Sequence, residues 1–81
     1  MKKIGKVTHY YNNIDVAVVE LSGKLSVGDR VKFVSGQNEF EQTVESMQIE
    51  HENISSAKKG DMIGLKVGEK VNEGAEVYLV E

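Results

Sequence analysis

The stretch that decides the fold is VGDRV at residues 27–31, because its pattern returns as KGDMI at 59–63 and as EGAEV at 73–77. In each copy a glycine comes just before the apolar residues of a strand-like run. Glycine adopts positive φ without steric cost, so each copy predicts a tight turn that leads into a strand. In two copies an aspartate follows, and its carboxylate can accept hydrogen bonds from nearby backbone N–H groups. We interpret these residues as turn formers rather than ligand sites.

Around these turns the chain divides into short runs of β character, separated by Gly, Asn and Asp. Six strands are predicted, at residues 3–10, 15–21, 30–34, 39–50, 62–67 and 76–80. The centre of the second run is apolar on both faces, which is typical of a strand covered from both sides. With no convincing amphipathic helix, the pattern predicts an all-β fold, specifically a small closed six-stranded antiparallel-type β-barrel.

Two segments need a more particular interpretation. In the fourth run, Phe40 and Val44 follow one phase of alternation, whereas Met47 and Ile49 follow the other. A β-bulge near residues 45–46 would shift the phase and bend the strand, as closure of a small barrel requires. Residues 51–59 are polar and helix-tolerant, and we expect either one helical turn or a loop there.

Length and composition limit the class of protein. The 81 residues predict one domain, 1–81, and an initiator-like Met1 with an end just after the last run indicates that this domain is the whole gene product. The chain has no cysteine, which excludes disulfides, thiolate metal sites and a cysteine nucleophile. Small secreted domains usually depend on disulfides, so we expect a cytoplasmic location. The longest apolar run, at 16–19, is too short to cross a bilayer, and no membrane association is expected.

The sequence shows no recognisable catalytic machinery. The only histidines, His9 and His51, lack the spacing of metal ligands, and no nucleophile elbow is present. A raised carboxyl pKa needs a buried apolar site, which a chain of this size can hardly provide. We therefore expect neither an enzyme nor a metal or cofactor site.

The charge is unevenly distributed. Residues 1–40 contain six Lys/Arg and four Asp/Glu, whereas residues 41–81 contain four Lys and nine Asp/Glu, for a net charge of −3. Nucleic-acid binders usually carry a basic surplus. A nucleic-acid contact would therefore need a local basic face, for which the candidates are Lys2, Lys3, Lys6, Lys24, Arg30 and Lys32.

The candidate partner-binding residues are Tyr10, Tyr11, Asn12 and Asn13, together with Lys2, Lys3 and Lys6. Adjacent residues of a strand point to opposite faces, so one of the two tyrosines is expected to be exposed. An exposed tyrosine beside asparagine amides can stack on a base or anchor a protein partner. Alternatively, the tyrosines cover the barrel mouth and the lysines are ordinary solvated surface.

The order of these motifs carries a family resemblance. GKLSVGDRV at 23–31 resembles the G-x-L-x-x-G-D-x-V signature of domain 2 of translational GTPases, VESMQI at 44–49 resembles that domain's next strand, and AKKGDMIGL at 57–65 resembles its A-x-x-G-D-x-V-G-L element. The resemblance to domain 2 of elongation factor Tu implies a translation-protein barrel that contacts tRNA or the ribosome. Similar barrels are also fused to some collagenase-like peptidases. No G-x-x-x-x-G-K-[ST] motif is present, so no GTP binding is expected.

Two functional hypotheses follow. The first is a non-catalytic binding module that contacts RNA or a protein partner in translation or RNA metabolism. The alternative is a protein–protein interaction domain, or a substrate-positioning subunit for a separately encoded enzyme such as a collagenase-like peptidase. The sequence does not predict the oligomeric state.

Overall fold

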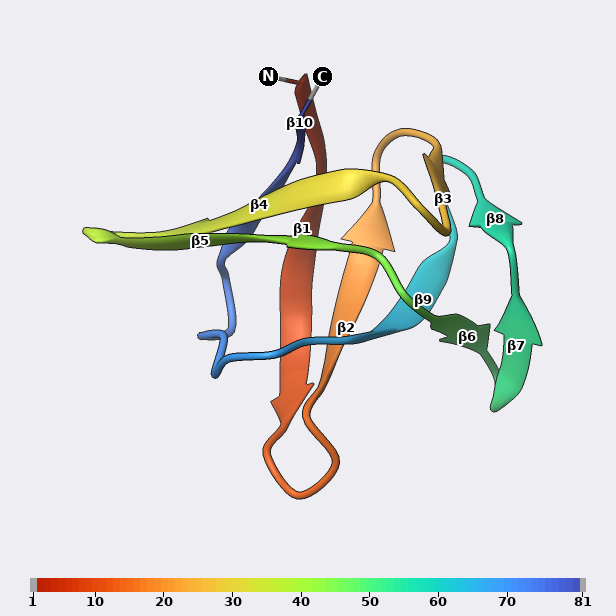
Figure 1. The fold of residues 1–81 in the computed structure, drawn as a ribbon, viewed down its shortest axis with the longest axis horizontal. Helices are drawn as coiled ribbons and strands as arrows, with labels where there is room; N and C mark the ends of the chain where they lie inside the picture. The colour runs from red at the N-terminus through yellow and green to blue at the C-terminus, as the bar shows by residue number, and fades with distance from the viewer. Residues whose placement is uncertain (1, 81) are drawn as a thin grey trace.

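The structure, a computed structural model, describes residues 2–80 and contains ten β-strands and no helix in that range (Figure 1). The predicted domain bounds of 1–81 include Met1 and Glu81, which lie outside the described residues. The strands are β1 (Lys2–Tyr11), β2 (Val16–Leu21), β3 (Leu25–Ser26), β4 (Arg30–Ser35), β5 (Asn38–Thr43), β6 (Met47–Ile49), β7 (Glu52–Ile54), β8 (Ser56–Ala57), β9 (Met62–Lys66) and β10 (Glu76–Val80).

Eight of the strands form one antiparallel sheet in the order β5-β4-β10-β1-β2-β9-β6-β7, and β3 pairs with β8. The all-β antiparallel prediction is therefore confirmed. Strand pairing does not close the sheet, because β5 and β7 remain as edges, so the closed barrel stays a prediction. The prediction of six strands is wrong, since short strands form in segments interpreted as loops or as parts of longer strands.

The core lies on the inner face of this strongly folded sheet. Every second residue of the central strands points inward, as in Ala17, Val19 and Leu21 of β2 or Ile63 and Leu65 of β9. The buried side chains of the described residues are all hydrophobic and form one cluster that joins β4 to β1, β2 and β9. One face of the sheet therefore supplies the apolar burial that stabilises the domain.

The three repeated glycines take the predicted conformation. Gly28, Gly60 and Gly74 have φ values of 98°, 95° and 90°. In each turn the N–H that follows the glycine donates to the carbonyl three residues earlier, at 3.0 to 3.1 Å. Positive φ at the third position of a four-residue turn is the geometry of a type II turn, so the prediction is confirmed.

The two aspartates of the repeat also act as predicted. The Oδ2 atom of Asp29 accepts a hydrogen bond from the N–H of Ser26 at 2.9 Å, and Oδ2 of Asp61 accepts one from the N–H of Lys58 at 3.0 Å. Each carboxylate thus satisfies a backbone donor within its own turn. Their role in this structure is local and structural.

The predicted long strand at 39–50 is wrong, because it is broken into β5 and β6. At the break, buried Val44 exchanges backbone hydrogen bonds with the first repeated turn: its N–H donates to Asp29 O at 2.8 Å, and its carbonyl accepts from Gly28 N–H at 2.9 Å. The chain leaves β4 there and joins β9. The change in apolar phase therefore reflects a change of partner strand, not a bulge within a continuous strand.

Residues 51–59 contain strands β7 and β8 instead of the expected helical turn or loop. Glu50 and His51 both have positive φ, of 51° and 67°, and connect β6 to β7 as a two-residue hairpin. Two successive positive φ values define a type I′ turn, whose twist matches that of paired strands. This turn folds the polar segment back as a strand, which its composition does not reveal.

Edge strand β5 is attached to the segment after β9 by one side chain. The Gln42 amide donates from Nε2 to Lys66 O at 2.7 Å and accepts at Oε1 from Gly68 N–H at 2.9 Å. The side chain thus makes both hydrogen bonds that a backbone peptide of a neighbouring strand would make. It connects two segments that strand pairing leaves apart.

Candidate partner-binding surfaces

The two adjacent tyrosines lie on opposite faces of β1, as predicted. Tyr10 is half-buried against the core, and its hydroxyl donates to Asp15 Oδ1 at 3.3 Å. Burial raises the pKa of Tyr10, and the nearby Asp15 carboxylate raises it further. Tyr11 is 49% exposed, and its ring meets the His9 ring edge-on with centroids 4.3 Å apart. The expectation of one exposed tyrosine is confirmed, whereas its role as a partner contact stays a prediction.

The predicted lysines do not join this loop. Asn12 and Asn13 are exposed in the hairpin turn that follows Tyr11, at one end of β1. Lys2 and Lys3 are at its other end, and at the rise of an extended strand Lys3 and Tyr11 are roughly 25 Å apart. Figure 1 shows this separation, with the start of β1 and the β1–β2 hairpin at opposite ends of the molecule. The structure therefore divides the predicted site into two surfaces.

At the lysine end of β1, part of the positive charge is paired with Glu76. Lys3 Nζ lies 2.9 Å from Glu76 Oε2. Their hydrogen bond is the main cause that raises the pKa of Lys3 and lowers the pKa of Glu76. Lys6 is exposed, lies opposite Glu76 in the β1–β10 register, and also lowers the pKa of Glu76.

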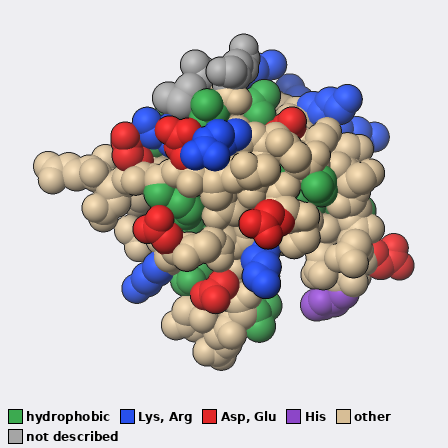
Figure 2. All heavy atoms as spheres, viewed as in Figure 1, with side chains coloured by type: hydrophobic (Ala, Val, Ile, Leu, Met, Phe, Trp, Pro, Cys, Tyr) green, Lys and Arg blue, Asp and Glu red, His purple; other side chains and the backbone are tan. Residues whose placement is uncertain are grey.

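Two of the other basic candidates, Arg30 and Lys32, are paired in the same way. Arg30 Nε lies 3.0 Å from Glu41 Oε1, and Lys32 Nζ lies 3.0 Å from Glu39 Oε1. Figure 2 shows acidic and basic side chains close together on the visible face. Such a mixed surface lacks the basic surplus that phosphate binding requires. Three of the six basic candidates, Lys3, Arg30 and Lys32, are therefore held in cross-strand ion pairs.

An apolar groove on the outer face of the sheet was missed from the sequence. It has a volume of about 240 Å³ and extends from the β1–β2 hairpin across β2 and β9 to the β6–β7 turn. Its floor includes the half-buried residues Val16, Val18 and Gly64. The groove is lined by Tyr11, Ile14, Val16, Val18, Gln48, Glu50, His51, Met62, Ile63 and Gly64.

Two signals in the sequence point to this groove. Ile14 is a large apolar residue inside the turn 12–15, where polar residues are usual, and it is 60% exposed. Met62 stands out of phase with Ile63 and Leu65, so it must point away from the core, and it is 50% exposed. Pairing of β2 with β9 then places both residues beside one groove, which requires the tertiary structure.

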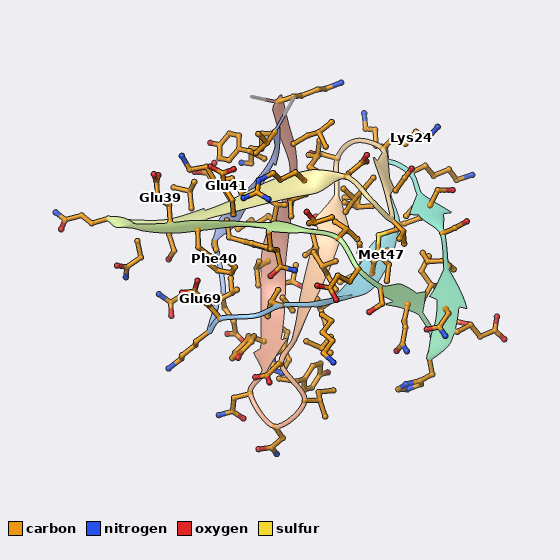
Figure 3. All side chains as sticks on the ribbon, in the orientation of Figure 1. Lys24, Glu39, Phe40, Glu41, Met47 and Glu69 are labelled. Carbon is orange, nitrogen blue, oxygen red and sulfur yellow. The ribbon has the colours of Figure 1, made fainter. Side chains whose placement is uncertain are left out.

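A second hollow lies between the β4–β5 hairpin and residues 67–75. It has a volume of about 350 Å³, and its lining includes Phe33, Phe40 and Glu69. The rings of Phe33 and Phe40 stack with centroids 5.1 Å apart. In Figure 3, Phe40 lies between β5 and the segment that carries Glu69. This hollow exposes part of the core cluster, and its lining is more polar than the lining of the groove.

The histidines belong to different surfaces. His9 Nδ1 lies 2.7 Å from Glu73 Oε2 on an exposed surface, and His51 is in the β6–β7 turn. Within residues 2–80, no three His, Cys, Asp or Glu side chains are grouped as metal binding would require.

No helix in the described part of the chain is long and apolar enough to cross a membrane.

Comparison with known proteins identifies the fold. Two crystal structures of the C-terminal domain of a putative U32 peptidase from Geobacillus thermoleovorans superpose with TM-scores of 0.91 and 0.92. The first, a selenomethionine variant, has 20% identity and aligns over 96% of this chain and 99% of its own. The second has 19% identity and aligns over 99% of this chain and 93% of its own. The chain therefore has the fold of this peptidase domain.

A relative with closer sequence similarity is an uncharacterized protease of Methanocaldococcus jannaschii. It is 38% identical over 80 residues, which are 98% of this chain but 20% of the relative. The chain thus spans about a fifth of the length of the curated relative it matches. No protein-family profile matches the chain.

These matches correct the resemblance to elongation factor Tu. The relative and both solved neighbours are named as a protease or a peptidase domain, and nothing among them points to a translation factor. The assignment to domain 2 of elongation factor Tu is wrong, and so are the roles in translation and RNA binding that depended on it. The shared Gly-Asp signatures encode type II turns and strand entries, which unrelated functions can use.

Proposed function

We propose that this chain is a non-catalytic, protein-binding module of a U32-type peptidase. The observation that carries the proposal is the match of nearly the whole chain to one fifth of a protease at 38% identity. A segment of that size has the dimensions of one domain, and it leaves most of the protease for the catalytic portion. The proposal applies whether the module and the catalytic portion share one polypeptide or are encoded separately.

The fold and the use of its polar groups support a binding role. The neighbours with the same fold are described as a C-terminal domain of a putative U32 peptidase. In this chain Asp29 and Asp61 are engaged in turns, and His9 is paired with Glu73. The exposed apolar groove instead supplies the type of surface that protein partners cover. Of the two hypotheses drawn from the sequence, these observations favour the alternative, in which the chain accompanies a peptidase.

Complex formation with a peptidase tests the proposal. The chain is mixed with the part of the M. jannaschii protease that lies outside the matched fifth, which the proposal takes as the catalytic portion. The mixture is analysed by size-exclusion chromatography with light scattering. We expect a one-to-one complex at protein concentrations of about 10 μM, because inter-domain interfaces resemble transient protein interfaces. Total tRNA, added in a parallel run, is expected to elute separately from the chain.

Hydrolysis of a labelled denatured protein provides a second readout. The catalytic portion alone and the catalytic portion with excess chain are compared at equal enzyme concentration. We expect the chain to change the rate or the KM of hydrolysis. Separate elution of the two proteins together with identical kinetics would contradict the proposed function.

A further inference from the structure

We propose that the apolar groove across β2 and β9 is the surface that docks the catalytic portion of the peptidase, through an apolar segment of that portion with a Lys or Arg at one end. This inference rests on the proposed function and assigns it to one face of the domain. It places the contact away from the lysines at the start of β1.

The first support is the composition of β2. Valines occupy both faces of this strand, a pattern typical of strands covered on both sides. On the inner face Ala17 and Val19 are fully buried, whereas on the outer face Val16 and Val18 are half-buried at the floor of the groove. The domain itself therefore covers one of the two apolar faces, and the other is available to a partner.

The second support is the concentration of exposed apolar side chains. Among the described residues the exposed large hydrophobic side chains are Tyr11, Ile14, Val27 and Met62, and all but Val27 line the groove. Hydrophobic side chains are visible at the β1–β2 hairpin in Figure 2. Interface cores are enriched in tyrosine and methionine, and a few such anchors carry most of the binding energy.

The third support is backbone strain at the rim. Glu50 and His51 hold the left-handed conformation in a turn that favours Asn-Gly. Such strain in residues other than glycine is typically retained where side chains serve a function. Both residues line the groove, so their side chains are available to a partner.

The charge around the groove indicates the chemistry of the occupant. Glu20 lies opposite Met62 in the β2–β9 register, and Glu50 is at the rim, while Lys66 lies opposite Val16 at the other end. The chain as a whole carries a net charge of −3. An apolar segment with a Lys or Arg at the end that meets Glu20 and Glu50 complements this arrangement. The catalytic portion is the occupant we assign, because the matched fifth of the relative is joined to it in one protein.

Substitution of an exposed apolar side chain that lines the groove tests the inference. Met62→Lys is expected to weaken binding to the catalytic portion of the M. jannaschii protease at least about thirty-fold in a calorimetric titration, since it places a charge at an apolar anchor. Val27→Lys is the matched control, because it makes the same type of change at an exposed apolar residue outside the groove. The control is expected to bind within twofold of the wild type, and both variants should retain the wild-type circular dichroism spectrum.

Relief of the strained turn provides a second test with effects in opposite directions. The double substitution Glu50→Asn with His51→Gly is expected to raise the midpoint of thermal unfolding by about 4–8 °C, because Asn-Gly favours the type I′ turn. The same variant is expected to bind the catalytic portion at least about threefold more weakly, because two rim side chains are lost. Higher stability with unchanged affinity would show that the β6–β7 turn is not part of the docking surface.

The outcomes separate the inference from the proposed function. If the wild-type chain binds and Met62→Lys binds equally well, the groove is not the docking surface, although the module still serves the peptidase. If the wild-type chain does not bind, both statements fail. If Met62→Lys loses affinity for a denatured protein substrate and keeps it for the catalytic portion, the groove is a substrate site and the inference is overturned.

Discussion

Phe33→Ala is expected to lower the free energy of unfolding by about 3–5 kcal/mol, the range for removal of a fully packed aromatic side chain. Phe33 lies on β4, is 2% exposed, and stacks on Phe40. It packs in the cluster that joins β4 to the strands on the other side of the core. The truncated side chain would leave a cavity in an interior with few alternative contacts.

Urea denaturation followed by circular dichroism measures this loss. A domain of 81 residues has a total stability of only about 4–12 kcal/mol, so the expected loss is a large share of it. Tyr11→Ala is the control, because it removes an aromatic ring that is 49% exposed, and we expect a change of less than about 1 kcal/mol. A loss below about 1 kcal/mol for Phe33→Ala would show that the core is not packed as described.

Gly5→Ala is expected to destabilise the domain by about 2–3 kcal/mol through overpacking. A Cβ atom at Gly5 would lie 2.7 Å from Val19 Cγ1 and 2.9 Å from Glu20 O. Gly5 is buried in β1, which is paired with β10 on one side and with β2 on the other. Neither neighbouring strand can move away without disturbing the sheet, so the methyl group cannot be accommodated cheaply.

Gly68→Ala is the matched control for this substitution. The nearest atom to a Cβ at Gly68 is Gln42 Oε1, at 3.9 Å, which is an ordinary contact distance. Its unfolding free energy is expected to stay within about 0.5 kcal/mol of the wild type. Equal midpoints of thermal unfolding for the two alanine variants would mean that β1 and β2 approach less closely at Gly5 than the structure shows.

Local rules predicted the features that depend on a few neighbouring residues. Positive φ at Gly28 and the backbone contacts of Asp29 and Asp61 follow from turn chemistry, and the exposure of one of the two adjacent tyrosines follows from the alternation of faces along a strand. These features need no knowledge of distant partners. They can therefore be predicted from a few consecutive residues.

Features that depend on partner strands could not be predicted in this way. Val44 ends β5 by bonding to a turn formed by residues 28–29, and Gln42 bonds to residues 66 and 68. The β6–β7 turn was missed because Glu50 and His51 are not the residues that type I′ turns favour. The lysines and Tyr11 were assigned to one candidate surface, although the length of an extended strand separates Lys2 and Lys3 from Tyr11.

The resemblance to domain 2 of elongation factor Tu was also misleading because it depended on local motifs. The Gly-Asp motifs that carried it are explained by the geometry of the turns, and turn geometry does not determine function. The groove that distinguishes this surface combines Ile14 and Val16 with Met62 from a distant segment of the chain. Its apolar character was visible in the two-faced pattern of β2, but its position required the pairing of β2 with β9.

Hydrogen–deuterium exchange of the full chain, alone and with the catalytic portion of the M. jannaschii protease, tests the account most directly. Docking in the groove should slow exchange at the backbone amides of residues 11–16, of β9 and of the β6–β7 turn. Exchange in the β4–β5 hairpin and at the start of β1 should not change. Unchanged exchange throughout the chain, or slowing confined to β4, β5 and the start of β1, would contradict the account.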